Sequence, residues 1–243
     1  MAAALGGVVL AGCGAAPSAT QPRPERPAPV PTAPVGIPPA TGGGQATNPA
    51  EVDGLLVGIR QARQNVKGFT GTVVTFEDGP KGKANETLEI AFKKPSTLKI
   101  KVAKSSGGNE GTQLLWHGGE DCKVKPSYLP FAVSIKMSDE RLLGKNNWEI
   151  GQTEVNSILT VILDPSSRLK ALGDQAHDGK TLAMIELVSP LTPKGGAREV
   201  VGIDKVTKLP GVRMIYDAKG KLIYRLTIKQ LTMKTPSAKE LDI

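Results

Sequence analysis

A regular alternation of apolar and polar residues after residue 68 limits the possible folds more than any other feature of the sequence. Apolar residues take every second position in three clear runs: Leu88, Ile90 and Phe92; Leu98, Ile100 and Val102; and Leu222, Tyr224, Leu226 and Ile228. Successive side chains of a strand point to opposite faces, so each run predicts a strand with one buried and one solvated face. Clusters of Gly, Pro and Asp separate the runs and indicate turns. The pattern therefore predicts a long antiparallel sheet.

Two segments with helical spacing are available to cover the apolar face of that sheet. Residues 51–66 and 152–163 each carry apolar side chains along one face, and Asp164-Pro165 ends the second segment. A further turn is expected at residues 167–172, and the long connection at 128–148 is a third candidate cover.

The predicted order is a helix, about four strands, an irregular middle with one or two helices, and about four more strands. This order lacks the strict strand–helix alternation of a parallel sheet. We therefore expect an α+β, mainly β fold: a curved antiparallel sheet, or incomplete β-barrel, covered by one or two helices.

The first fifty residues differ in composition from the rest of the chain. They hold ten of the nineteen prolines and only three charged residues, Arg23, Glu25 and Arg26. Such a segment buries too little apolar surface to offset the entropy of ordering. We expect a signal-like segment at 1–12, a Pro/Gly-rich tether at 13–50 and a domain at 51–243.

A short apolar run leads into Leu10-Ala11-Gly12-Cys13, which resembles the lipobox of bacterial lipoproteins. The resemblance implies that Cys13 is lipidated and anchors a cell-envelope protein that faces the periplasm. Gly14 would favour the outer membrane in a host with two membranes. No Lys or Arg precedes the run, so we expect the natural start to lie upstream. The alternative is a chance match within an Ala/Gly-rich stretch.

No motif for catalysis, metal binding or cofactor binding is found. The sequence has no G-x-S-x-G, no P-loop, no dinucleotide fingerprint, no H-E-x-x-H and no C-x-x-C. His117 and His177 are sixty residues apart, and Cys122 is expected to be a half-buried small residue. We therefore predict neither catalytic nor metal-binding residues, no cofactor and no enzymatic activity.

The chain is basic, with a formal net charge of +8. Five lysines cluster along two predicted strands: Lys93, Lys94, Lys99, Lys101 and Lys104. A solvated outer face explains them, and attraction to anionic headgroups or an acidic partner is the alternative. Nucleic acid is not expected, because aromatic residues beyond Phe92 do not interleave with the basic ones.

Short segments of the domain share residues and spacing with one family. They are Phe69-Thr70-Gly71, Phe92 to Ile100, Leu115 to Gly118, and Asp204 to Pro210 followed by Asp217 to Lys221. They resemble the Lol lipoprotein-carrier (LolA/LolB-like) superfamily, and in particular a lipoprotein branch of it. The resemblance covers about residues 51–243. It implies an open β-barrel with a helical lid and an apolar cavity for acyl chains.

Two functions are consistent with these features. The first is non-catalytic binding or carrying of a lipid or lipoprotein acyl chain. The candidate cavity-lining residues are Phe92, Leu98, Ile100, Leu114, Trp116, Phe131, Ile158, Leu159 and Ile162. The second is a structural or sensor interaction domain of the envelope that holds no lipid. An apolar void of several hundred Å³ favours the first function, and a filled interior favours the second. No oligomeric state is predicted.

The lipobox gives the first testable prediction. Cys13→Ala should abolish acylation and membrane association, because it removes the thiol that carries the lipid. The mass of the N-terminal peptide and partitioning into detergent measure the two effects. Cys122→Ala is the control and should remain acylated. Unchanged acylation of Cys13→Ala would show that the lipobox match is a coincidence.

Overall fold

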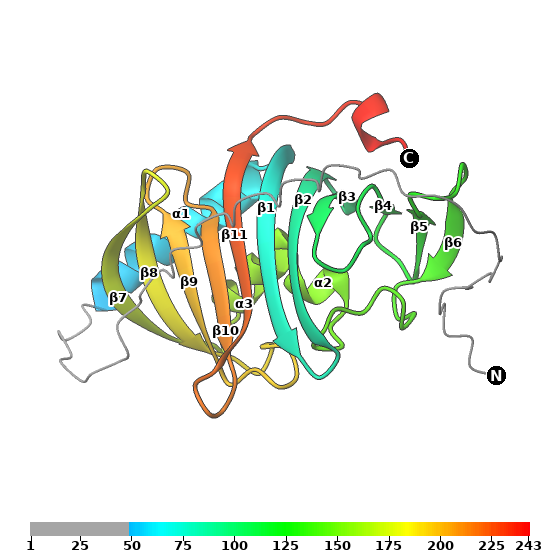
Figure 1. Ribbon diagram of the computed structural model, residues 1–243. Helices are drawn as coiled ribbons and strands as arrows, with labels where there is room; N and C mark the ends of the chain where they lie inside the picture. The colour runs from blue at the N-terminus through cyan, green and yellow to red at the C-terminus, as the bar shows by residue number, and fades with distance from the viewer. Residues whose placement is uncertain (1–48) are drawn as a thin grey trace, which may run out of the picture. The chain divides into compact units, whose positions relative to one another are not determined.

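One curved antiparallel sheet, with its helices on a single face, makes up the computed structural model (Figure 1). The structure describes residues 49–243. Cys13, the signal-like segment and almost all of the predicted tether lie outside these residues. The predicted domain start at residue 51 therefore stays a prediction.

Eleven strands of the described residues pair in the order β6-β5-β4-β3-β2-β1-β11-β10-β9-β8-β7. The bounds are β1 Gly68–Gly79, β2 Gly82–Lys93, β3 Thr97–Ser105, β4 Gln113–Trp116, β5 Asp121–Lys125, β6 Val133–Lys136, β7 Arg168–His177, β8 Lys180–Val188, β9 Arg198–Asp204, β10 Pro210–Tyr216 and β11 Leu222–Thr232. β6 and β7 are the two edges and do not pair with each other, so the barrel is incomplete. The first and last strands, β1 and β11, are neighbours in the middle of the sheet.

The α-helices lie behind the sheet in Figure 1. They are α1 (Pro49–Asn65), α2 (Ile150–Thr153) and α3 (Val155–Leu163), and a short 3₁₀ turn, η1 (Lys239–Leu241), follows β11. α3 buries its apolar side chains in the main core, including Ile158, Leu159 and Ile162. This core also takes in residues of α1 and of the facing strands.

The predicted fold class is confirmed, and three details of the prediction are wrong. Residues 152–163 are not one helix, because Glu154 is extended (φ −77°, ψ 167°) and separates α2 from α3. Residues 168–172 belong to strand β7 instead of a turn. The sheet also has more strands than predicted, because β4, β5 and β6 are only four or five residues long.

Capping explains the break at Glu154. The Glu149 and Gln152 side chains form a capping box at the start of α2. The Glu154 carboxylate then accepts a hydrogen bond from the Asn156 N–H at 2.6 Å, which caps α3. The Glu154 N–H itself donates to the Ile150 carbonyl at 3.1 Å and closes α2. One residue therefore ends one helix and begins the next.

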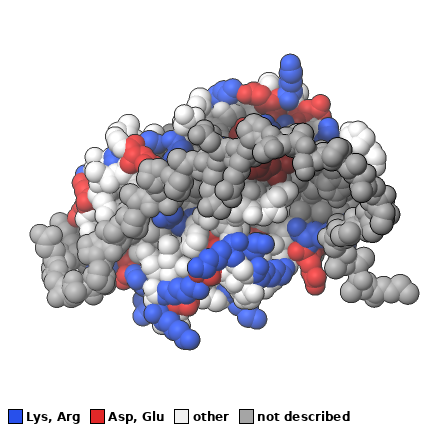
Figure 2. All heavy atoms as spheres, in the orientation of Figure 1, with Lys and Arg blue, Asp and Glu red and all other residues white. Residues whose placement is uncertain are grey.

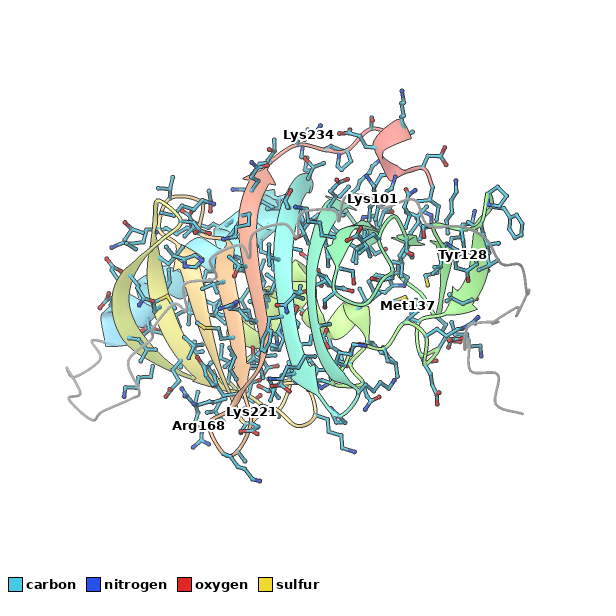
Figure 3. All side chains as sticks on the ribbon, viewed as in Figure 1. Lys101, Tyr128, Met137, Arg168, Lys221 and Lys234 are labelled. Atoms are coloured by element: carbon cyan, nitrogen blue, oxygen red, sulfur yellow. The ribbon has the colours of Figure 1, made fainter. Side chains whose placement is uncertain are left out.

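Charged side chains cover much of the outer surface. Figure 2 shows Lys and Arg gathered along the lower part of the face in view, where Figure 3 labels Arg168 and Lys221. Acidic partners lie among them, since the Asp78 carboxylate pairs with the ammonium groups of Lys221 at 3.0 Å and Lys83 at 3.3 Å. The two lysines are more than half exposed, so these surface pairs contribute little to stability.

A fully buried ion pair connects the sheet to the junction of α2 and α3. The Arg213 guanidinium of β10 donates to both carboxylate oxygens of Glu199 of β9, at 2.7 and 3.0 Å. Both side chains are 0% exposed. The remaining guanidinium nitrogen, Nη1, donates to the Gln152 carbonyl at 2.9 Å and the Ser157 hydroxyl at 3.2 Å. The pair is therefore satisfied by hydrogen bonds, as a buried pair must be.

Arg213→Met should destabilise the domain by about 3–5 kcal/mol, because it leaves the Glu199 carboxylate buried without its partner. The double variant Arg213→Met/Glu199→Leu should recover most of that loss, since no buried charge remains. Urea denaturation followed by circular dichroism measures both. A double variant no more stable than the single one would show that the guanidinium is needed mainly for its bonds to α2 and α3.

Candidate functional site

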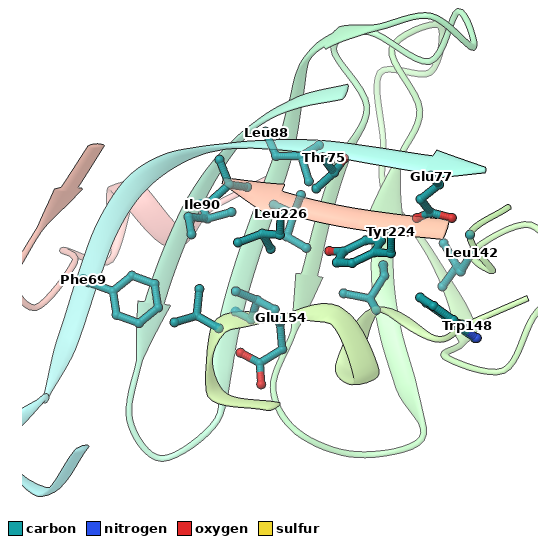
Figure 4. Close-up of a pocket in the computed structure, with 16 residues that line it drawn as sticks. Phe69, Thr75, Glu77, Leu88, Ile90, Leu142, Trp148, Glu154, Tyr224 and Leu226 are labelled. Carbon is teal, nitrogen blue, oxygen red and sulfur yellow. The ribbon is translucent and has the colours of Figure 1, made fainter. Parts of the chain in front are cut away.

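An apolar cavity lies between the sheet and the segment that runs from residue 142 to α3 (Figure 4). Its volume is about 130 Å³. Sixteen residues line it: Phe69, Val73, Thr75, Glu77, Leu88, Ile90, Leu98, Ile100, Leu142, Gly144, Trp148, Ile150, Glu154, Val155, Tyr224 and Leu226. The set is predominantly aliphatic and aromatic, which suits an apolar ligand.

The register of four central strands places the sheet residues of this wall side by side. On β1, Thr75 pairs with Leu226 of β11, and Glu77 pairs with Tyr224. On the other side of β1, Val73 pairs with Leu88 of β2. Further along, Ile90 of β2 pairs with Ile100 of β3. Because paired residues point to the same face, these alternating positions combine into one continuous apolar surface.

The connection before α2 closes the cavity on the opposite side. The Trp148 indole packs edge-on against Tyr224, with ring centroids 5.8 Å apart, and its N–H donates to the Lys194 carbonyl at 2.8 Å. The Asn146 side chain donates to the Ile223 carbonyl at 3.0 Å. These hydrogen bonds attach Asn146 to β11 and Trp148 to the connection between β8 and β9.

Glu77 holds the same connection at the wall of the cavity. Its carboxylate accepts the backbone N–H groups of Lys145 at 2.5 Å and Asn146 at 3.4 Å. Gly144 makes this approach possible, since a Cβ there would lie 2.6 Å from a Glu77 oxygen. Burial raises the pKa of Glu77, and the two N–H groups oppose that shift.

Glu154 is the second carboxyl group on the cavity wall, opposite the sheet in Figure 4. Burial raises its pKa to about 7, although the Asn156 and Ser157 N–H groups and the nearby Arg213 charge act in the opposite direction. Near neutral pH this group therefore exists in both charged and neutral forms.

A second, more open pocket of about 430 Å³ adjoins the cavity. It is lined by Arg63, Gln64, Phe92, Lys94, Pro95, Ser96, Leu98, Trp116, Glu154 and Asn156. Leu98 and Glu154 line both spaces and so stand between them. We call the two spaces the inner cavity and the outer pocket.

The structure distributes the nine predicted site residues over five places. Leu98 and Ile100 line the inner cavity, and Phe92 and Trp116 line the outer pocket together with Leu98. Ile158, Leu159 and Ile162 are buried in the main core beside the cavity. Leu114 belongs to a smaller cluster under β4 and β5. Phe131 is 59% exposed in the β5–β6 connection, so its predicted place in the wall is corrected.

Sequence reasoning missed Glu77 and Glu154 as members of the cavity wall. Glu77 lies near the end of a strand and Glu154 at a helix junction. Carboxylates are common at both kinds of position, so the sequence gives no sign that these two line a cavity. Arg213 carried a better signal, because it is the lone charge within the apolar strand β10. A charge in such a strand indicates a buried partner of opposite sign.

The remaining titratable candidates do not form a second site. Burial raises the pKa of the Cys122 thiol, which disfavours a nucleophilic thiolate. His117 contacts Thr97 at 3.2 Å, while burial lowers the pKa of His177. Within residues 49–243 no cluster of His, Cys, Asp or Glu has the composition of a metal site. None of the helices in that range has the length and apolarity needed to cross a membrane.

The raised pKa of Glu154 predicts a pH-dependent stability. Its folded-state pKa of about 7 exceeds the ordinary value of 4.5, so the folded state binds the extra proton between these two pH values. The free energy of unfolding should therefore fall as pH rises from 4.5 to 7, by at most about 1.4 kcal/mol per pH unit.

Glu154→Gln should remove this slope, and Glu149→Gln, at the exposed cap of α2, is the control variant. Urea denaturation of each variant between pH 4.5 and 8 measures the effect. A slope that persists in Glu154→Gln would assign it to other groups.

Comparison with known proteins finds similarity in the fold alone. No protein-family model and no curated protein sequence matches the chain. An uncharacterized conserved protein from Thermus thermophilus is similar in structure, with 12% identity and a TM-score of 0.51 over 79% of this chain and 92% of that one.

Two weaker structural likenesses accompany it. The lipoprotein LppX of Mycobacterium tuberculosis has 16% identity and a TM-score of 0.47 over 76% of this chain and 98% of its own. A LolA superfamily protein from Nitrosomonas europaea has 11% identity and a TM-score of 0.36 over 79% and 97%. The open, curved sheet with helices on one face is the architecture that the sequence resemblance implied. The described residues therefore share their fold with the Thermus thermophilus protein.

Proposed function

We propose that this protein is a lipid-anchored cell-envelope protein that binds an acyl chain of a lipid or lipoprotein without catalysis. The inner cavity supports the proposal, because four strands, α2, α3 and residues 142–148 converge on a space that apolar side chains line. Cys13, outside the described residues, would attach the chain to the membrane. The lipidated protein would then face its ligand within the same envelope compartment.

Burial of methylene groups would provide the binding energy. Each CH₂ group transferred from water to an apolar site contributes about 0.8 kcal/mol, so several groups give useful affinity without a hydrogen bond. The polar atoms of Glu77 and Glu154 lie at the wall and are engaged by backbone N–H groups. They leave the space between Leu88, Ile100 and Leu226 apolar.

The volume of the inner cavity requires that the protein open to admit a whole chain. About 130 Å³ resembles the roughly 150 Å³ cavity that holds one benzene, and it is below the roughly 300 Å³ at which ligand pockets begin. We propose that residues 142–148 move to admit the chain. Opening would break their hydrogen bonds to Glu77, Ile223 and Lys194 and withdraw the buried Trp148 indole from the core. Loop opening of this kind is a common way to gate a cavity.

An interaction domain without lipid is the second candidate function. The small volume of the inner cavity favours it, and so does an exposed aromatic pair in the β5–β6 connection. Tyr128 is 72% exposed and Phe131 is 59% exposed, and Figure 3 shows Tyr128 pointing away from the sheet edge. Exposed aromatic side chains are frequent in protein–protein contacts.

A matched pair of substitutions separates the two candidate functions. Ile100 and Leu114 are cross-strand neighbours on one face, but only Ile100 lines the inner cavity. Ile100→Trp should fill the void, abolish binding of a neutral fluorescent acyl probe and preserve the melting temperature. Leu114→Trp should overpack its cluster and cost about 1–3 kcal/mol of stability.

Probe fluorescence and thermal melting of the full chain provide both readouts. If the wild type binds no neutral probe and both Trp variants lose stability alike, the interior is a filled core. The interaction-domain function would then replace lipid binding.

A further inference from the structure

The outer pocket combines an apolar floor with a cationic rim. Phe92, Leu98 and Trp116 contribute the apolar part, and Arg63 and Lys94 contribute two positive charges. The only acidic residue among those that line it is Glu154, at its inner end. A pocket with one apolar and one positive side matches a molecule with a chain and an anionic group.

The two cations are held in place by the end of α1. The Lys94 ammonium donates to the carbonyls of Arg63 at 2.8 Å and Gln64 at 2.9 Å, in the last turn of the helix. The Arg63 guanidinium donates to the Thr160 hydroxyl of α3 at 3.1 Å, through one of its nitrogens. Each group keeps further N–H donors for a ligand, since an ammonium has three and a guanidinium five.

The other lysines of the sequence cluster have different surroundings. Lys101 pairs with Glu89 at 3.1 Å, and Lys99 donates to the Asp242 carbonyl. Both alternate with the cavity residue Ile100 along β3 and so lie on the opposite face of the sheet. Lys94 alone of the five lines the outer pocket. The positive rim is thus separate from the solvated outer face.

The outer pocket leads toward the inner cavity. Leu98 and Glu154 line both spaces, and the Phe92 ring of the outer pocket stacks on Phe69 of the inner cavity with centroids 5.2 Å apart. A chain that enters between Arg63 and Lys94 would meet Leu98 and Glu154 at the boundary between the two spaces. In its neutral form, Glu154 does not repel an anion at this point.

We propose that the outer pocket binds the anionic group, carboxylate or phosphate, of an amphiphile at Arg63 and Lys94, while its chain passes Leu98 and Glu154 into the inner cavity. This inference rests on the proposed acyl-chain function and adds the charge and the direction of the ligand. The ligand's charged end would stay at the mouth, where water still reaches it.

Two probes of equal chain length test the inference on the full-length protein. Dansylaminoundecanoic acid is anionic, and its methyl ester is neutral. The Arg63→Gln/Lys94→Gln variant should bind the acid about tenfold more weakly and the ester with unchanged affinity. The control, Arg168→Gln/Lys104→Gln, removes the same charge from two exposed residues outside both pockets and should change neither affinity.

The ratio of the two affinities distinguishes a charge effect from structural damage. If the double variant weakens both probes equally, or changes neither, the cations do not recognise the anion and the inference is wrong. If the wild type binds neither probe, the acyl-chain function itself fails. Arg63→Lys should keep the preference for the acid, since it retains the charge.

Inorganic phosphate distinguishes an amphiphile from a free anion. It should displace the acid only weakly, because it has no chain to bury. Displacement at concentrations similar to those of the probe would identify a free-anion site and overturn the proposal.

Discussion

The buried pair of Arg213 and Glu199 ties α2 and α3 to the sheet. Glu199 neutralises the guanidinium, and the guanidinium in turn binds the backbone of α2 and the Ser157 side chain of α3. Apolar contacts alone would let short helices slide along a smooth sheet, because hydrophobic attraction is non-directional. The charged bonds fix one position. In that position Glu154 faces the strands, and the inner cavity remains between them.

The sequence predicted those parts of the fold whose environment is simple. β2, β3 and β11 show a period of two because their alternate apolar residues face the main core, and α1 has a single apolar side. The break at Glu154 was hidden because Val155, Ile158 and Ile162 keep helical spacing on one side of it. β7 was missed because much of this edge strand is exposed, which leaves weak alternation.

The candidate site was harder to predict than the fold. Leu98 and Ile100 were identified because they belong to a regular strand. The role of Glu77 depends on Lys145 and Asn146, and that of Lys94 depends on the end of α1, at residues distant in sequence. Periodicity indicates which face of a strand or helix a residue occupies, but not which other part of the chain packs against it. Phe131 shows the limit, since an aromatic residue in a long connection carries no sign of its direction.

The pairing of β1 with β11 has a consequence for how the chain acquires its structure. Val74 near the beginning of the domain pairs with Thr227 near its end, in the middle of the sheet. A ribosome must therefore release almost the whole domain before these two strands can meet. Contacts between such distant segments slow folding, and until they form, β1 and β10 each expose an unpaired edge. The nascent chain is thus most vulnerable to aggregation just before its last strand emerges.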